Sequence, residues 1–137
     1  MPAWLPENAI IAIHGELLAE HGGLGGAKEE NSINKNALGS TLARPQQLEN
    51  YSNPAPTLFQ LAASYGFGFA KNHCFKDGNK RVALVSIDVF LQLNDYELNA
   101  SEVDAACTIE ALSASELTEE ELANWIEANS EKLEDGF

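Results

Sequence analysis

The spacing of apolar residues along the chain predicts a series of helices joined by short loops. Between positions 6 and 21, residues suited to a buried face recur at intervals of three and four, as on one side of a helix; they are Ile10, Ile13, His14, Leu17 and Leu18. Pro6 suits the first turn of this helix, and Gly22 and Gly23 suit its end. The pattern therefore predicts an N-terminal helix with one buried side.

The next stretch is less regular. The glycine-rich segment from 22 to 31 predicts a flexible connection, and Ser32 is a suitable N-cap for a shorter helix that runs to about Ala43. Pro45 should end that helix, because proline lacks the backbone N–H that the interior of an α-helix needs. Prolines, asparagines and serine between 46 and 56 then predict a loop that could include a short hairpin.

Two strongly apolar segments follow and predict a pair of buried helices. The first begins at a suitable N-cap, Thr57, and is apolar around most of its circumference as far as His73, so it should be central and closely packed. The second runs from 79 to about 93 with apolar residues at helical spacing. The segment between them therefore joins two core helices.

The C-terminal part of the pattern predicts two more helices. A turn at 94–95 and a brief extended piece at 96–98 precede two capping-box patterns: Ser101 with Asp104, and Thr118 with Glu121. The last helix should expose many carboxylates and bury three apolar residues, Leu122, Trp125 and Ile126. The whole pattern predicts an all-α or nearly all-α protein.

Length and composition place this architecture in one domain. A chain of 137 residues with 45% hydrophobic content can bury one core, so we expect a single domain over residues 1–137. No apolar run approaches the roughly 20 residues that cross a bilayer, and the first residues lack the pattern of a signal peptide. Cys74 and Cys107 cannot build a disulfide framework. These features predict a cytoplasmic protein that does not interact with membranes.

The distribution of charge adds a candidate site. A formal net charge of −13 disfavours a general nucleic-acid binder, which needs an excess of basic residues. Four of the eight lysines and arginines nevertheless lie between 71 and 81, where Asp77 is the only acid, so that window carries +3 and the rest of the chain −16. We interpret the window as a discrete anion site. The alternative, a solvated helix face, would usually mix both signs.

The segment HCFKDGNKR within this window contains groups suited to phosphate. Where the chain bends into the helix after Asp77, first-turn N–H groups lack carbonyl partners and, together with the helix dipole, attract anions. Gly78 leaves the backbone accessible to a phosphate, and Asn79 can donate an amide hydrogen bond. Lys80 and Arg81 can add positive charge, Arg81 in bidentate fashion.

Three further residues complete the interpretation. Asp77 would repel phosphates unless a divalent cation lay between them, so we expect it to bind Mg²⁺. His73 can accept a proton from a hydroxyl nucleophile near neutral pH, and Phe75 can hold the loop to the core. Taken singly, each residue also fits an ordinary helix end, turn or solvated surface. Together, within nine residues, they indicate phosphoryl or nucleotidyl transfer.

The pattern His-x-Phe-x-Asp-Gly-Asn-Lys-Arg resembles the signature of the Fic/Doc (Fido) family. Segments 13–26, 32–46, 61–73 and 81–98 are similar to its death-on-curing (Doc) branch, so the resemblance covers roughly residues 6 to 112. It implies the Fido fold, a compact bundle of about six helices around a central motif helix. It also implies roles in catalysis: His73 as the base, Asp77 as the Mg²⁺ ligand, and Gly78, Asn79, Lys80 and Arg81 as phosphate binders.

Three departures from the family pattern bear on the reaction. In the family at large the motif ends Gly-Asn-Gly-Arg-x-x-Arg, and members transfer AMP from ATP to a hydroxyl. Here Lys80 replaces the second glycine, and Leu84 stands where the last arginine would be. These changes imply that the triphosphate binds in the reverse sense and presents its γ-phosphate; the branch that shares the lysine phosphorylates a translation elongation factor. Cys74 stands where proline is common, which raises the alternative of a Cys-His nucleophile.

The resemblance also implies partners. Many Fido proteins carry an inhibitory helix with the pattern Ser/Thr-x-x-x-Glu-Gly/Asn, which this chain lacks, so we expect inhibition by a Phd-type antitoxin whose disordered tail folds on the toxin. The resulting hypothesis is a toxin of a type II toxin-antitoxin system that uses ATP and Mg²⁺ to phosphorylate a Ser or Thr hydroxyl of elongation factor Tu. The alternatives are an AMP transferase with the same loop and a catalytically silent binding module.

Overall fold

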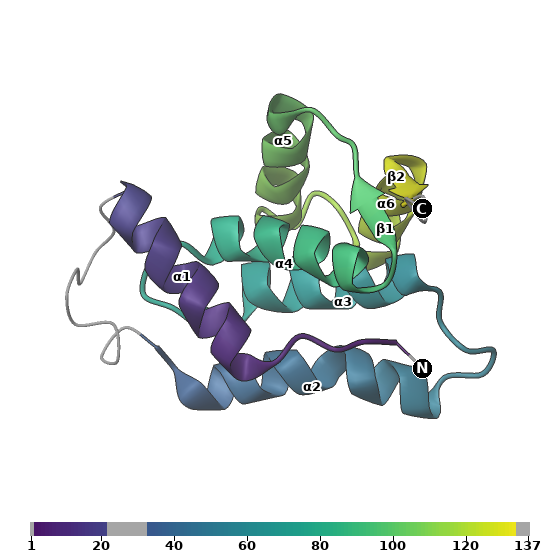
Figure 1. Ribbon diagram of the computed structural model, residues 1–137, viewed down its shortest axis with the longest axis horizontal. Coiled ribbons are helices and arrows are strands. Elements are labelled where there is room, and N and C mark those ends of the chain that lie inside the picture. The colour runs from purple at the N-terminus through teal and green to yellow at the C-terminus, as the bar shows by residue number, and fades with distance from the viewer. Residues whose placement is uncertain (1, 22–32, 134–137) are drawn as a thin grey trace.

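The computed structural model describes residues 2–21 and 33–133. Within them the chain forms six helices and two short strands, shown in Figure 1: α1 (Glu7–His21), α2 (Lys35–Tyr51), α3 (Leu58–Lys71), α4 (Asn79–Leu93), β1 (Tyr96–Leu98), α5 (Glu102–Ser113), α6 (Glu119–Ala128) and β2 (Ser130–Lys132). The predicted all-α class is confirmed. In this part of the chain no helix combines the length and apolarity that a bilayer span requires. The predicted flexible connection at 22–31 lies outside the described residues.

Helix α3 occupies the centre of the molecule. It packs against α4, α2 and α6, and nine of its 14 residues are buried, including Tyr65 and Phe69, both 0% exposed. Thr57 caps it in a reciprocal box, because the Thr57 hydroxyl accepts from the Gln60 N–H and the Gln60 side chain accepts from the Thr57 N–H. The predicted cap and the predicted pair of buried helices are both confirmed, with α4 beside α3 in Figure 1.

Two glycines allow α3 to approach its neighbours closely. A Cβ at Gly66 would overlap a side chain of α4, and a Cβ at Gly68 would lie 2.7 Å from Cγ2 of Thr41 in α2. Thr41 is held in place, because its hydroxyl donates to the Ala37 carbonyl and accepts from the Asn72 amide, each at 2.8 Å. The packing of α3 therefore depends on the absence of a side chain at these positions.

The start of α2 differs from the prediction. Its N-cap is Asn34, whose side chain accepts from the N–H of Ala37 at 3.0 Å. The predicted cap, Ser32, lies outside the described residues. Asparagine is as good an N-cap as serine, so residue type alone gives no preference for Ser32 over Asn34.

The end of α2 also differs from the prediction. The helix continues through Pro45 to Tyr51, so the predicted end near Ala43 is wrong, and only 52–56 of the predicted loop or hairpin is non-helical. Proline removes one hydrogen bond from the helix. Pro45 is itself buried, however, and Leu48 beyond it still packs against the core. The buried face of α2 thus extends across the proline, which explains why the helix does not end there.

Packing between α5 and α6 corrects one capping prediction. Ser101 caps α5 by accepting from the Asp104 N–H. The Asp104 carboxylate accepts instead from the indole Nε1 of Trp125 at 3.0 Å, so it joins two helices and does not complete the box. The predicted box at the start of α6 is confirmed, with Thr118 and Glu121 bonded reciprocally.

The C-terminal segment contains a pairing that the sequence pattern did not predict. The extended piece at 96–98 is confirmed as β1, and it pairs antiparallel with β2, with Tyr96 opposite Lys132. In α6, Leu122 and Ile126 are fully buried as predicted, whereas Trp125 is only half-buried. The strand pair therefore ties the end of α6 to the end of α4.

Gly68→Ala should destabilise the fold by about 1–3 kcal/mol, since overpacking against Thr41 outweighs the better helix propensity of alanine. Gly39 is a matched control, because it is exposed in α2 and nothing lies within 4 Å of the position of its Cβ. Gly39→Ala should stabilise the fold by about 0.5–1 kcal/mol. Urea denaturation measures both changes, and equal effects would contradict the close contact of α2 and α3.

Candidate active site

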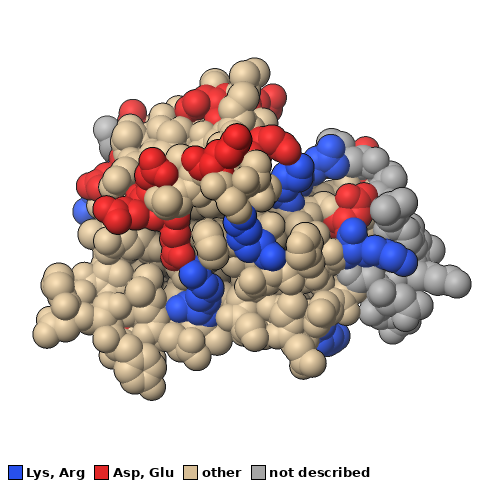
Figure 2. Space-filling model, turned by 180° about the vertical axis from the view of Figure 1, so that it is seen from behind, with Lys and Arg blue, Asp and Glu red and all other residues tan. Residues whose placement is uncertain are grey.

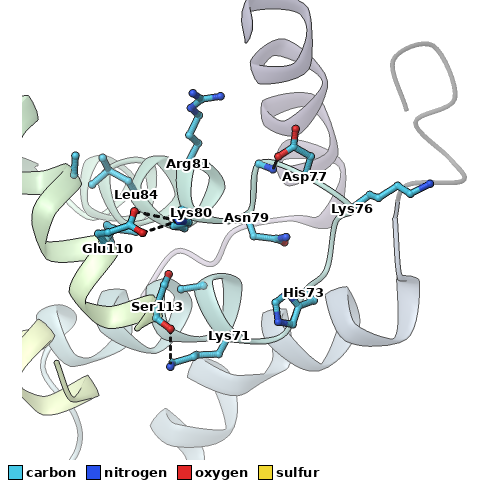
Figure 3. Close-up of a pocket in the computed structure, with 14 residues that line it drawn as sticks. Lys71, His73, Lys76, Asp77, Asn79, Lys80, Arg81, Leu84, Glu110 and Ser113 are labelled. Carbon is cyan, nitrogen blue, oxygen red and sulfur yellow. Dashed lines mark hydrogen bonds and ion pairs between the residues drawn. The ribbon is translucent and has the colours of Figure 1, made fainter. Parts of the chain in front are cut away.

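The motif residues surround one cleft at the junction of α3, α4 and α5, shown in Figure 3. Its volume is about 760 Å³. The end of α3, the motif loop (residues 72–78) and the first turns of α4 form one wall, and a face of α5 forms the other. Six of the predicted site residues line it: His73, Asp77, Gly78, Asn79, Lys80 and Arg81. The structure thus brings together the residues that the sequence grouped and adds a wall from a later helix.

His73 lies where α3 ends. It follows the C-cap Asn72 and has a φ of +50°, a left-handed conformation that histidine adopts more readily than most other residues with a side chain. The side chain is exposed at the cleft, and its imidazole makes no hydrogen bond to a described residue. An exposed imidazole that makes no such hydrogen bond can accept a proton from an incoming hydroxyl.

Phe75, predicted to hold the loop to the core, is 3% exposed. Its ring stacks on the ring of His14 in α1, with the centroids 4.0 Å apart and the planes at 16°. Beside it, the N–H of Asn34 donates to the carbonyl of Cys74 at 2.7 Å. The motif loop is therefore attached both to α1 and to the residues that begin α2.

Asn79 uses its side chain to close the motif loop. Its Oδ1 accepts from the Phe75 N–H at 3.0 Å, and its Nδ2 donates to the Phe75 carbonyl at 2.8 Å. This role was not foreseen from the sequence. Phosphate binding by Asn79 stays a prediction, and it now relies on the backbone N–H and the second amide hydrogen of this residue.

The N-terminus of α4 is left without a side-chain cap. Its N-cap is Gly78, at a φ of +86°, and no side chain accepts from its first turn, whereas α2, α3, α5 and α6 each begin with a capping Asn, Thr or Ser. The Asp77 carboxylate accepts from the N–H of Gly78 at 2.8 Å, before the helix begins. The first-turn N–H groups of α4 can therefore bind an anion in the cleft.

His14 is a site-supporting residue that the sequence did not identify. It is 1% exposed, and its Nε2 donates to the carbonyl oxygen of Asp77 at 3.0 Å. Its Nδ1 is buried and has no hydrogen-bond partner among the described atoms. His14 appeared in the sequence only as part of the buried face of α1; the one signal of a further role was a polar side chain among apolar ones.

Two of the lysines at the cleft bind to α5 or to the residues just after it. Lys80 Nζ donates to both carboxylate oxygens of Glu110, at 2.8 and 3.0 Å. Lys71 Nζ donates to the carbonyl of Ser113 at 3.2 Å and to the hydroxyl of Ser115. Arg81 is exposed and makes no ion pair with a described residue. On the face of the molecule in Figure 2, Lys and Arg side chains form a band across the middle, and carboxylates gather above it.

The cleft contains few metal-ligating groups of its own. Within the described ranges, no three His, Cys, Asp or Glu side chains lie close enough together to hold a metal ion. Asp77 and Glu110 are the carboxylates that line the cleft, and Glu110 is bound to Lys80. One carboxylate is nevertheless a usual protein contribution to Mg²⁺, because phosphate oxygens and water supply the other ligands. The residues present therefore fit Mg²⁺ only together with a bound nucleotide.

Comparison with known proteins agrees with this geometry. The model of the Fic/DOC family matches residues 4–91, which include α3, the motif loop and all but the last two residues of α4. The chain belongs to the Fic/DOC family. It is 31% identical over 106 residues to "Protein kinase doc" of Escherichia phage P1, covering 77% of this chain and 79% of that protein. It is also 37% identical over 70 residues to "Toxin Doc" of Mycolicibacterium smegmatis, covering 50% and 54%. The resemblance to the death-on-curing branch is thereby confirmed.

Two of the three departures of this Fic/DOC protein from the wider family pattern fall at the cleft. Lys80 and Leu84 both line it, one turn apart on α4. Lys80 therefore places a cation where the wider pattern has no side chain. Leu84 presents an apolar side chain where that pattern has a second arginine. The cationic groups of α4 are thus concentrated in its first turn.

Cys74 does not fit the role of a nucleophile. Its side chain is 0% exposed and does not line the cleft, and its Sγ lies 3.3 Å from the hydroxyl of Thr41. Burial raises the pKa of the Cys74 thiol, which lowers the fraction of thiolate at neutral pH. The Cys-His alternative is therefore not supported by the geometry of the Fic/DOC site.

Thiol labelling should separate the two cysteines. At pH 8 the native protein should react rapidly with Ellman's reagent at the exposed Cys107 and slowly at Cys74, because the raised pKa and the burial of Cys74 both oppose attack. In the Cys107→Ser variant the rapid phase should disappear, and reaction should return on unfolding. A rapid phase in that variant would contradict the buried position of Cys74.

Substitution of His14 should separate its two contacts. His14→Phe keeps an aromatic ring against Phe75 but removes the donor to the Asp77 carbonyl, so we expect a loss of about 1 kcal/mol of unfolding free energy. His14→Ala removes both contacts and should cost about 3 kcal/mol. Urea denaturation measures both values. Equal losses would show that the stacked ring contributes nothing.

Proposed function

We propose that this Fic/DOC protein is a Doc-like toxin that transfers the γ-phosphate of ATP to a Ser or Thr hydroxyl of elongation factor Tu and so blocks protein synthesis. The observation that carries the proposal is the arrangement at the cleft, which is lined both by the uncapped N-terminus of α4 and by the imidazole of His73. The similarity to a protein named protein kinase doc and to one named toxin Doc supports it.

In this proposal the phosphates bind at the start of α4. The first-turn N–H groups, the helix dipole and Arg81 hold the anionic oxygens, and Lys80 joins them when it leaves Glu110. Asp77 is the residue that would hold Mg²⁺. The ion would supply positive charge that offsets the negative charge of the phosphates.

His73 acts as the general base. The hydroxyl oxygen of the target forms a bond to the γ-phosphorus, the bond from that phosphorus to the β–γ bridging oxygen breaks, and the hydroxyl proton moves to His73. ADP is the leaving group. The exposed position of His73 suits this role, because the base must reach a residue on another protein.

Transfer of AMP is the second candidate, since the same loop could present the α-phosphate. We favour γ-phosphate transfer because Lys80 projects a cation into the cleft and Leu84 contributes none. A catalytically silent module is the third candidate, and the intact set of His73, Asp77 and Arg81 argues against it. We propose that a Phd-type antitoxin, encoded beside the toxin, inhibits it.

Intact mass spectrometry distinguishes these reactions. After incubation with ATP, Mg²⁺ and elongation factor Tu, the target should gain about 80 Da for a phosphate, whereas a gain of about 329 Da would indicate AMP. His73→Asn is the sharpest variant, because asparagine tolerates the positive φ of this position but cannot act as the base. Its rate should fall at least about 100-fold.

The controls are the thermal midpoint and the nucleotide affinity of His73→Asn, which should both stay close to those of the unaltered protein. A variant that retained full activity would remove His73 as the base. Unchanged mass of the target together with no growth arrest on expression would contradict the toxin hypothesis as a whole.

A further inference from the structure

The wall that α5 contributes to the cleft contains one acidic side chain, Glu110, which the sequence did not single out. Both of its carboxylate oxygens accept from Lys80 Nζ, at 2.8 and 3.0 Å. Figure 3 shows that this contact directs Lys80 toward α5, while the neighbouring Arg81 points away from Glu110. The two cations in the first turn of α4 are therefore in different states: one is paired within the protein, and the other makes no ion pair with a described residue.

We propose that Glu110 controls nucleotide binding by competing with the phosphates for Lys80. The inference rests on the proposed function, because it takes ATP·Mg²⁺ as the ligand of the cleft. The ammonium group of Lys80 can form an ion pair either with the Glu110 carboxylate or with a phosphate oxygen. When it pairs with phosphate, Glu110 becomes an unpaired anion in the same cleft. Glu110 is thus a positioning residue that acts through Lys80.

The exposure of the pair limits the strength of this competition. The side chain of Lys80 is 52% exposed and that of Glu110 is 68% exposed, so water and salt screen the attraction. A pair of that kind is formed roughly 60–85% of the time, which lowers the apparent affinity of a ligand that needs free Lys80 about two- to sixfold. The contact therefore adjusts affinity reversibly and does not block the cleft.

Glu110→Gln tests the competition, because it removes the charge and keeps the size of the side chain. Calorimetry with the non-hydrolysable analogue AMP-PNP and Mg²⁺ at low salt should show a Kd about two- to sixfold lower than that of the unaltered protein. Glu110→Ala should give the same gain. The matched control is Glu102→Gln, which makes the same charge change in α5 at an exposed position outside the cleft and should leave Kd within about 1.5-fold.

Combining the Glu110 substitution with a substitution of Lys80 tests whether Glu110 acts through Lys80. Lys80→Gln should weaken binding, and adding Glu110→Gln to it should lower Kd by a clearly smaller factor than in the unaltered protein, because no ion pair remains to be released and only the repulsion between the carboxylate and the phosphates is removed. An equal gain in both backgrounds would overturn the proposal by showing that Glu110 only repels phosphate. An unchanged or higher Kd for Glu110→Gln would overturn it as well.

The same titrations separate this inference from the proposed function. If neither the unaltered protein nor the Glu110 variants bind the analogue, the assignment of ATP to the cleft fails, and the inference fails with it. If they bind with equal Kd values, only the role of Glu110 is overturned.

Discussion

The cleft depends on how the motif loop satisfies its own polar groups. The side-chain amide of Asn79 makes two hydrogen bonds with the backbone of Phe75, and His14 donates a hydrogen bond to the carbonyl of Asp77. These bonds are partly buried. The first turn of α4 consequently keeps its N–H groups for the cleft, where a side-chain cap would otherwise have occupied them. An anion site of this kind requires that the loop be stable without the anion, and the stacking of Phe75 on His14 provides that stability.

The helices α3 and α4, which flank the motif loop, fix the positions of its two ends. α3 and α4 are both buried, so the positions at which one ends and the other begins are set by core packing. Between them the chain reverses through two left-handed residues, His73 and Gly78. Glycine adopts this conformation readily, whereas at His73 it costs free energy and persists because the surrounding structure enforces it. The expected base and the centre of the phosphate cradle are thus placed at the two ends of a short connection between rigid elements.

The sequence predicted the parts of this structure that depend on local chemistry. Thr57, Thr118 and the apolar faces of α3 and α4 are local signals, and the corresponding elements formed as expected. The predicted end of α2 near Pro45 was wrong, because the helix continues where its buried face packs against residues that are distant in sequence. Around the cleft, six motif residues that lie within nine positions of the sequence came together. Glu110 and His14 were missed, since 30 and 63 residues separate them from their partners, Lys80 and Asp77.

The contribution of α5 to the cleft has a consequence for how the protein can diverge. The Fic/DOC family match ends at residue 91, while the second wall of the cleft comes from α5, which begins at Glu102. The candidate catalytic residues and the wall that faces them are therefore encoded in separate stretches of the gene. Substitutions in α5 can alter what the cleft admits without disturbing the loop that would perform the chemistry. The shape and charge of the cleft can thus evolve in one segment while the motif residues are preserved in another.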